Sequence, residues 1–533
     1  MLNKFFSVIA LFAILLATLI DLQPWVDHKY LRVGHADEAE IALLGRNIAE
    51  GKGAVVDCYW LLHGPGHKND SIPRPEGYWS LYVGYWFSLF FKIFGAGRTA
   101  VLLAASVCKT ATAVLVFAAL RKLTGSSLSG LTGLCGVLFL PQMTGRINGF
   151  SDIELTLSMM VSTFLLVTAW NRPKFSLWAL AGVFAGIATG VKPSGFISYG
   201  LMSAFCFYSI IFQKKSLKTG LTSFLCGSIG FVCGVLPLWI YNYQAAGSIN
   251  LPDFSRVSAA SAQIMIQGIS PSQAFYDPEL PTYASGFGTK AQLISWARNS
   301  LLYVLEYFHG DRIHPVILIP FIALGIARSK HLFTLGNTCV NTSFDPWILS
   351  CILLNVAGFL LSMFLHLEGR YWNFLVPINL LVAVYAMWGF HRLALICGLI
   401  TVLLIGTINT ISNVKITMNG SENAQKERIY RIGLTQADEN LPQDAIVITS
   451  DPWEFSFHTR RKTVVVPYNS NPEVLRKIAA RFSATHLAII NNDIRNPQLK
   501  KEITESSLDF LEKVYASKEL VIWKFNLEDA TGL

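Results

Sequence analysis

The chain has 533 residues, of which 52% are hydrophobic and only 14% are charged, and its mean hydropathy is positive. A water-soluble protein of this length would have too few charges to cover its surface, so the composition excludes that class and indicates an integral membrane protein. The net charge of +9 does not indicate a nucleic-acid-binding protein, because no basic run and no basic-aromatic interleaving occurs.

The N-terminal segment and the cysteines fit the same class. The apolar run 5–20 follows Lys4 but has no small-x-small cleavage site before Asp21, so we expect an uncleaved first membrane anchor. The nine cysteines are scattered and form no CxxC pair, which favours neither a disulfide framework nor a cysteine metal site.

Apolar runs long enough to cross or nearly cross a bilayer predict about eleven transmembrane helices. They lie near residues 4–21, 98–120, 127–145, 152–170, 175–190, 194–213, 219–243, 313–327, 346–366, 371–390 and 393–413.

Segment 76–95 is ambiguous, because it is long enough to span but is rich in Tyr and Trp, which favour the headgroup interface. If it lies along the interface and Lys4 is cytoplasmic, every short cytoplasmic loop carries Lys or Arg, as the positive-inside rule requires. These loops hold Arg121 and Lys122, Arg172 and Lys174, Lys214, Lys215 and Lys218, Arg328 and Lys330, and Arg392. We therefore expect segment 76–95 to be a juxtamembrane helix.

This topology predicts two domains. Residues 1–413 form a helical transmembrane domain with two long external loops, 22–97 and 244–312. Residues 414–533 have more charge and form a small soluble α/β domain on the same external side. Its expected strands are 445–449, 463–467, 486–490 and 520–525, and its expected helices are 472–482 and 497–514.

The first external loop holds a candidate catalytic carboxylate. Ile41, Leu44 and Ile48 share one face of a short predicted helix, and Asp37 and Glu38 lie at its N-terminus. The helix dipole and free amides there favour an ionised carboxylate, which suits a general base. The alternative is that Asp37 is an N-cap and Glu40 closes a capping box.

Other charged residues lie near the same predicted membrane face. Asp152 opens a span a few residues after Arg146, and a capping box over Ser151-Asp152-Ile153-Glu154 is the alternative explanation. Lys192 precedes Pro193 between two spans, where lysines commonly snorkel. The pair of residues Arg370 and Tyr371 precedes a further span, where interface anchoring is the ordinary explanation.

Two carboxylates and several cations at one membrane boundary suit group transfer from a phosphate-linked donor. A carboxylate can take the proton from an acceptor hydroxyl, and cations can stabilise a departing phosphate. Asp37, Asp152 and Glu38 are therefore the candidate catalytic residues. The candidate donor-phosphate ligands are Lys192, Arg370, Arg146 and Tyr371.

The pattern resembles the GT-C glycosyltransferases, within them the protein O-mannosyltransferase and lipid A aminoarabinose transferase group. The resemblance covers most of the membrane part. The motifs that carry it are Asp37-Glu38 after the first span, Ser151-Asp152 after Arg146, Gly190-Val191-Lys192-Pro193, and Glu368-Gly369-Arg370-Tyr371 before a span with Pro377.

The resemblance implies that Asp37 is the catalytic base, that the donor is a polyprenyl-phosphate sugar and that the anomeric centre is inverted. The acceptor is a lipid, glycan or protein hydroxyl. Arg74-Pro75-Glu76-Gly77 stands where protein mannosyltransferases have His-Pro-Pro-Leu, which argues against a protein acceptor. A divalent cation stays open, because relatives differ in metal use. The terminal domain favours a bacterial inner membrane with a periplasmic active site.

Two other functions remain open alternatives. One is a transporter or flippase of lipid-linked glycans, although such carriers usually have repeated halves and mid-membrane polar residues. The other is a glycan polymerase or ligase that uses Arg and His without an acidic base. His63, His67, His366 and Glu368 are further polar candidates, and Arg460, Arg461 and Lys462 could meet phosphates.

Overall fold

The computed structural model describes most of the helical residues and the C-terminal sheet. The described residues are 2–22, 36–59, 72–76, 81–140, 143, 151–171, 174–211, 216–246, 249, 294, 297–298, 345–362, 374–390, 392–418, 422–466, 472–490, 499, 501–503 and 508–527.

The chain forms two compact units, and each contains segments that are distant in sequence. The helical unit comprises residues 1–24, 102–240 and 292–412. The mixed unit comprises residues 25–101, 241–291 and 413–533. The C-terminal residues therefore share their unit with the first long external loop. The division of the chain at 413/414 stays a prediction.

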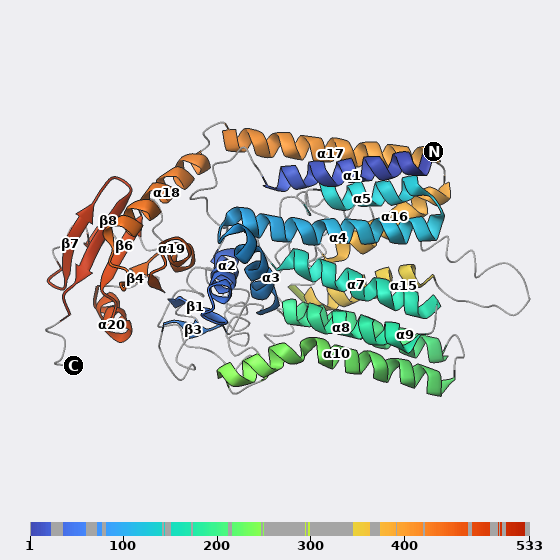
Figure 1. Ribbon diagram of the computed structural model, residues 1–533, viewed down its shortest axis with the longest axis horizontal. Helices are drawn as coiled ribbons and strands as arrows, with labels where there is room; N and C mark the ends of the chain where they lie inside the picture. The colour runs from blue at the N-terminus through green and yellow to red at the C-terminus, as the bar shows by residue number, and fades with distance from the viewer. Residues whose placement is uncertain are drawn as a thin grey trace, which may run out of the picture. The chain divides into compact units, whose positions relative to one another are not determined.

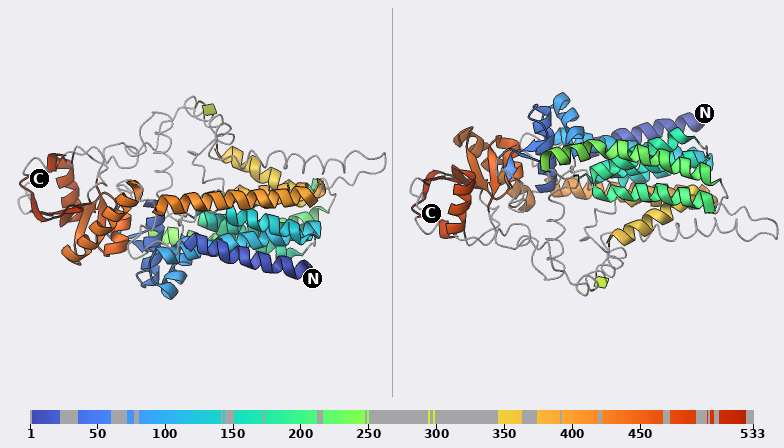
Figure 2. Two further views of the ribbon diagram at one scale, coloured as in Figure 1. Left: turned by 90° about the horizontal axis from the view of Figure 1, so that it is seen from above. Right: turned by 90° about the horizontal axis from the view of Figure 1, so that it is seen from below.

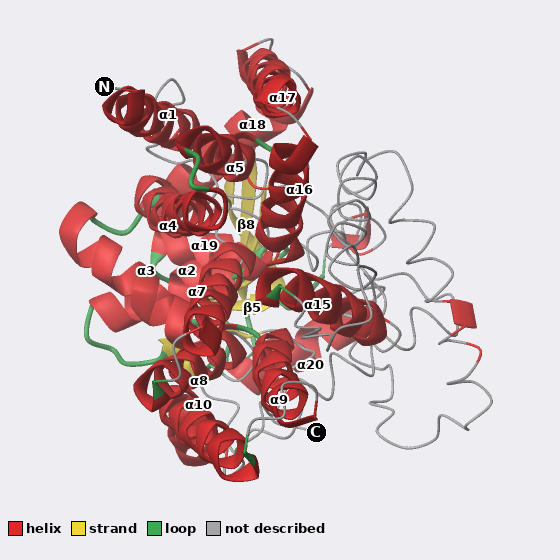
Figure 3. Ribbon diagram, turned by 90° about the vertical axis from the view of Figure 1, so that its right-hand side faces the viewer, coloured by secondary structure: helices red, strands yellow, loops and turns green. Residues whose placement is uncertain are grey.

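The helical unit consists of helices that lie side by side along a common direction (Figures 1 and 2). Viewed end-on, they form a packed array (Figure 3). They are α1 (Leu2–Leu22), α4 (Arg98–Thr124), α5 (Ser127–Phe139), α7 (Asp152–Asn171), α8 (Phe175–Val191), α9 (Phe196–Ile211), α10 (Leu217–Ala246), α15 (Pro346–Ser362), α16 (Val376–Phe390) and α17 (Arg392–Met418). The ends of α4, α10 and α17 extend into the mixed unit.

Ten of the eleven apolar runs coincide with these helices, and the run 313–327 lies outside the described residues. Within the described residues, five helices are long and apolar enough to cross a membrane, namely Phe5–Leu22, Arg98–Thr124, Asp152–Trp170, Pro193–Ile211 and Leu217–Ala245. The other apolar helices are shorter. The expectation of a multi-pass membrane protein is confirmed, whereas the number eleven stays a prediction.

A buried ion pair connects three helices of the helical unit. Lys109 of α4 donates from Nζ to the carboxylate of Asp21 on α1 at 2.6 Å, and both side chains are almost fully buried. Ser106 donates to the same carboxylate at 3.0 Å, and Nζ also donates to the carbonyl oxygen of Leu138 on α5 at 3.3 Å. Two opposite charges that are desolvated together must satisfy each other, so this pair fixes the end of α1 against α4 and α5.

Glycines allow α8 and α10 to approach at backbone distance. A Cβ atom on Gly182 would overlap the carbonyl oxygen of Gly227, and one on Gly186 would overlap that of Phe231. Apolar membrane helices gain little from desolvation in lipid, so close backbone packing of this kind is what holds them together.

The mixed unit contains a six-stranded sheet of strand order β2-β5-β4-β6-β8-β7 (Figure 1). Its strands are β2 (Cys58–Tyr59), β4 (Ile446–Thr449), β5 (Lys462–Val465), β6 (His486–Ile490), β7 (Leu511–Ala516) and β8 (Leu520–Phe525). The first four in the sheet order are parallel and the last two are antiparallel to their neighbours.

Helices cover both faces of this sheet. On one face α20 (Pro472–Phe482) packs Leu475 and Phe482 against Leu487 and Trp523. On the other face lie α18 (Glu422–Asn440) and α19 (Pro452–Thr459), and their apolar side chains join those of β4, β6 and β8 in a second core. Parallel strands that are buried on both faces read as continuous apolar runs, which is the pattern of β6.

The described residues of segment 22–97 supply part of this unit. The segment contains α2 (Ala36–Ala49), the short antiparallel pair β1 (Val55–Val56) and β3 (Arg74–Pro75), the edge strand β2, and α3 (Leu81–Phe94). The 14 residues of α3 extend about 21 Å, which is short of a hydrocarbon core of about 30 Å. Its assignment as a juxtamembrane helix stays a prediction.

The expected strands of the C-terminal domain agree with β4, β5, β6 and β8, and the expected helix 472–482 coincides with α20. The expected helix 497–514 is wrong at its C-terminal end, because residues 511–516 form β7. The apolar residues Leu508 and Phe510 pack against the sheet, and pairing with β8 outweighs local helix preference.

Replacing only one member of the Asp21–Lys109 pair should destabilise the protein strongly. Asp21→Leu or Lys109→Met leaves one uncompensated buried charge, which costs about 3–5 kcal/mol, whereas the double variant removes both charges and should recover most of that loss. The free energy of unfolding in detergent, measured by SDS titration, checks this. Equal stability of the two single variants and the wild type would refute it.

Gly182→Ala should destabilise the helical unit by about 1–3 kcal/mol, because the added methyl group forces α8 and α10 apart. Gly200→Ala is the matched control. A Cβ there meets no atom within 4 Å, so the change should be neutral or stabilise the helix by about 0.5–1 kcal/mol. Comparing the two thermal midpoints in the same detergent separates the effect of packing from that of helix propensity.

Candidate functional site

The helix α2 carries the candidate base in its first turn. Asp37 is partly exposed, whereas Glu38 is buried with 1% of its surface accessible. The apolar face expected from Ile41, Leu44 and Ile48 forms as expected, with Ile41 and Leu44 fully buried. The helix therefore has one partly exposed carboxylate, that of Asp37, and one buried carboxylate, that of Glu38.

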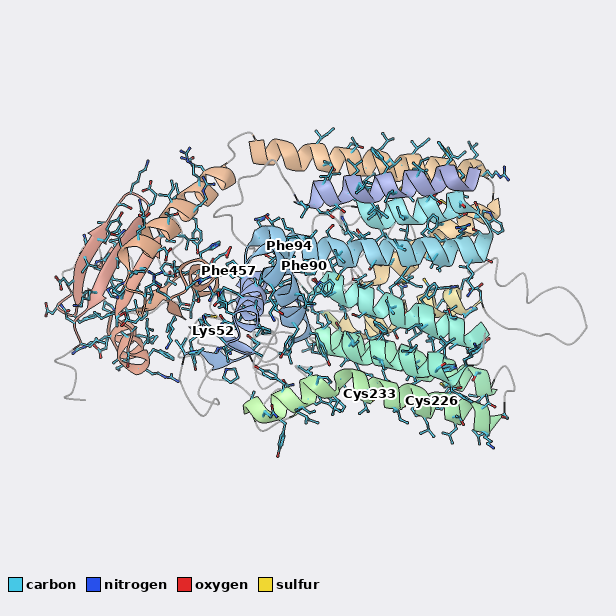
Figure 4. All side chains as sticks on the ribbon, viewed as in Figure 1. Lys52, Phe90, Phe94, Cys226, Cys233 and Phe457 are labelled. Carbon is cyan, nitrogen blue, oxygen red and sulfur yellow. The ribbon has the colours of Figure 1, made fainter. Side chains whose placement is uncertain are left out.

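The helix α3 packs closely on α2. A Cβ on Gly84 of α3 would overlap Leu44, and one on Gly45 of α2 would overlap Phe87. Phe90 and Phe94 lie further along α3 (Figure 4), and Phe94 is exposed. The two glycines make this contact possible because they leave room for the large side chains of the partner helix.

A buried ion pair attaches the β3 segment to α2. Arg74 donates from Nη2 to Oε1 of Glu40 at 2.9 Å, and both side chains are almost fully buried. Arg74 also donates from Nε to the carbonyl oxygen of Cys58 at 3.1 Å. Glu40 therefore takes part in a buried ion pair, which the sequence did not reveal.

A second buried cation, Arg46, attaches α2 to α19. Its Nη1 donates to the carbonyl oxygens of Ser456 at 2.8 Å and Phe457 at 2.7 Å, and its Nη2 donates to Oδ2 of Asp57 at 3.0 Å. Burial lowers the pKa of Arg46, and the charge of Asp57 partly opposes that shift. The guanidinium still stays protonated at neutral pH, because arginine does not lose its proton in proteins.

The helical unit brings together two residues that the sequence singled out. Asp152 lies in the first turn of α7, and Lys192 lies between α8 and the short 3-10 helix η2 (Pro193–Gly195). Lys192 donates from Nζ to Oδ1 of Asp152 at 2.5 Å. The backbone of Lys192 is extended, as is usual before proline, and this ends α8 where the pair forms.

A third charged residue lies beside this pair. Glu154 is 5% exposed, and neither of its carboxylate oxygens has a hydrogen-bond partner. Two carboxylates and one ammonium therefore gather at the beginning of α7. The lysine side chain is 18% exposed, in contrast to the fully enclosed Lys109.

Seven further candidates lie outside the described part of the chain, namely Arg146, Arg370, Tyr371, His63, His67, His366 and Glu368. Among the described residues, no group of three or more His, Cys, Asp or Glu side chains is arranged to hold a metal ion.

The fold and these charged groups define a multi-pass membrane protein with an ion pair at one end of its helical bundle. Residues 80–241 match the model of the dolichyl-phosphate-mannose-protein mannosyltransferase family. This segment includes Asp152 and Lys192 but not Asp37. The family resemblance expected from the sequence is found over this segment of the chain. No curated protein matches the chain.

Solved structures resemble this chain at low identity, and the two with a TM-score above 0.5 show the same fold. The oligosaccharyltransferase of Archaeoglobus fulgidus, in a complex with zinc and sulfate, is 12% identical with a TM-score of 0.54 over 90% of this chain and 68% of that chain. The same enzyme with an inhibitory peptide and a dolichol-phosphate is 13% identical with a TM-score of 0.51, covering 90% of this chain and 69% of that one. ArnT from Cupriavidus metallidurans bound to undecaprenyl phosphate is 13% identical with a TM-score of 0.49, covering 97% of both chains.

Proposed function

We propose that the protein moves a sugar from a polyprenyl-phosphate carrier to the hydroxyl group of a lipid, glycan or protein acceptor on the extracytoplasmic face of the membrane. The observation that carries the proposal is the Asp152–Lys192 ion pair, which lies inside the segment that matches the mannosyltransferase family. A bacterial inner membrane with a periplasmic active face is part of the same proposal.

Lys192 is the proposed ligand of the donor phosphate. Its ammonium is oriented by Asp152, and it retains some exposure, so a phosphate can reach it. As the bond between the sugar and the phosphate breaks, negative charge grows on the departing polyprenyl phosphate, and a fixed cation stabilises this charge. Arg146, Arg370 and Tyr371 are proposed to assist on the donor side.

Asp37 is the proposed general base. It removes the proton of the acceptor hydroxyl while the hydroxyl oxygen forms a bond with the anomeric carbon. The oxygen attacks from the side opposite to the phosphate, so the anomeric configuration inverts. The buried Glu38 is proposed to orient the acceptor or the base. At the end of this step the proton is on Asp37, and the electron pair of the broken bond between the sugar and the phosphate is on the phosphate.

Asp37→Asn preserves the shape of the side chain and removes its basicity, so transfer should fall by about 10²–10⁴-fold. The measurement uses source cells whose own copy of the gene has been deleted, and the glycan lost on deletion defines the product. Mass spectrometry then quantifies the product restored by each variant at equal membrane abundance. Asp444→Asn, an exposed aspartate of the C-terminal domain, is the matched control. Near wild-type product with Asp37→Asn would exclude Asp37 as the base.

Lys192→Met should reduce the same product by about 10²–10³-fold, because the phosphate loses a preorganised cation. Lys192→Arg retains the charge and should recover a large part of the activity. Lys218→Met removes an exposed lysine of α10 and should leave the product unchanged. If the Met and Arg variants at position 192 were equally active, the positive charge would have no role in transfer.

A further inference from the structure

The guanidinium of Arg46 occupies a position that links three segments of the mixed unit. Its side chain is 1% exposed, and it contacts α19, the strand edge at Asp57 and its own helix neighbour Asn47, whose Oδ1 lies 3.4 Å from Nη2. The planar fork of donors on an arginine suits such simultaneous contacts, whereas a lysine ammonium is a single point charge.

The contact with α19 uses the C-terminal end of that helix. The last carbonyl groups of a helix lack intrahelical partners and carry the negative end of its dipole, so a cation is favoured there. The carbonyl oxygen of Phe457 is such a group, and that of Ser456 also accepts from the backbone nitrogen of Arg460, which ends the helix in the left-handed conformation with φ of 59°. Arg46 therefore neutralises the end of α19.

Aromatic rings enclose the same contact. The guanidinium lies 5.7 Å from the ring centroid of Phe457, and that ring lies 6.1 Å from the ring of Phe91 on α3. Figure 4 labels Phe457 at the side of the C-terminal domain nearest to α2. Water is thus excluded from the ionic contacts, which makes them stronger than surface pairs.

The partner of Arg46 on the strand side is itself fixed by the sheet. The carbonyl oxygen of Asp57 accepts from the backbone nitrogen of Thr463 at 2.9 Å, and the next residues pair as β2 with β5. The ion pair therefore ties α2 to a strand edge that the C-terminal domain holds in register. Each of these anchors lies within one compact unit.

We propose that Arg46 is the positioning residue of the candidate base: it fastens α2 to the C-terminal domain and so sets the place of Asp37 at the other end of this helix. The inference rests on the proposed function of Asp37. Arg46 lies in the last turn of α2 and Asp37 in its first turn, so loss of the Arg46 contacts should displace Asp37 through the helix. Displacements of about 1 Å are enough to reduce a reaction by roughly 10²-fold.

Two readouts test the inference on the full-length protein. The product restored in the deletion strain should follow the order wild type, Arg46→Lys, Arg46→Met, with the Lys variant about tenfold and the Met variant about 10²-fold below wild type. Hydrogen exchange of the purified protein in lipid nanodiscs should be about tenfold faster in residues 36–49 of Arg46→Lys, and unchanged in β4, β6 and β8.

The control at the same contact is Lys52→Gln. Lys52 is 43% exposed, and its ion pairs with Glu50 at 3.1 Å and Asp57 at 3.8 Å lie at the rim, where such pairs contribute little. Both readouts should therefore stay at wild-type values. A loss as large as that of Arg46→Met would show that any disturbance of this contact abolishes activity, which contradicts a specific role for Arg46.

The outcomes separate the inference from the proposed function. Asp37→Asn should abolish the product and leave hydrogen exchange in α2 unchanged. If Asp37→Asn instead keeps wild-type product, only the proposed role of Asp37 as the base is overturned. The positioning role is overturned if Arg46→Lys leaves α2 exchange unchanged, if α2 loosens while the product stays at wild-type level, or if β4, β6 and β8 loosen equally. Lys and Met variants of equal activity would overturn it too.

Discussion

A buried guanidinium that no single segment can satisfy organises the mixed unit. Arg46 needs acceptors from α19 and from the strand edge, and those acceptors belong to residues about 410 positions further along the chain and to the loop that follows α2. A desolvated charge without partners costs several kcal/mol, so the first external loop and the C-terminal domain reach low free energy only when they fold together. The edge strand β2 reinforces the same coupling through backbone hydrogen bonds.

The other buried charges also need partners of opposite charge. The exposure of their side chains distinguishes the structural ion pairs from the candidate site. Asp21–Lys109 and Glu40–Arg74 are enclosed on all sides. Asp152–Lys192 differs, since its lysine keeps 18% of its surface and a second carboxylate, Glu154, lies nearby without a hydrogen-bond partner. A pair that serves only to join helices has no need for exposure, whereas a pair that binds an anion from outside needs both access and a charge whose orientation is fixed.

Sequence patterns predicted most of the elements and part of the site. Apolar runs located the helices of the bundle, and β-rich runs located β4, β5, β6 and β8, because burial dictates both patterns. The contact between Asp152 and Lys192 agrees with the sidedness that the basic loops predicted for these two residues. The Arg46 contacts were not predictable, because their acceptors are backbone carbonyls, and a carbonyl is present at every position of a sequence. Strand β7 was missed since its identity depends on pairing with β8.

The family match separates the residues proposed to bind the donor from those proposed to act on the acceptor. The matched segment, residues 80–241, contains the ion pair proposed to hold the donor phosphate, while Asp37 and Arg46 precede it and the C-terminal domain follows it. On the proposed mechanism the chemistry of the donor is the same for every carrier-linked sugar, so its ligands suit a shared segment. The acceptor varies between enzymes. On this proposal, a base whose helix is fixed by a buried arginine outside the matched segment can be matched to a different acceptor without altering the residues proposed to hold the phosphate.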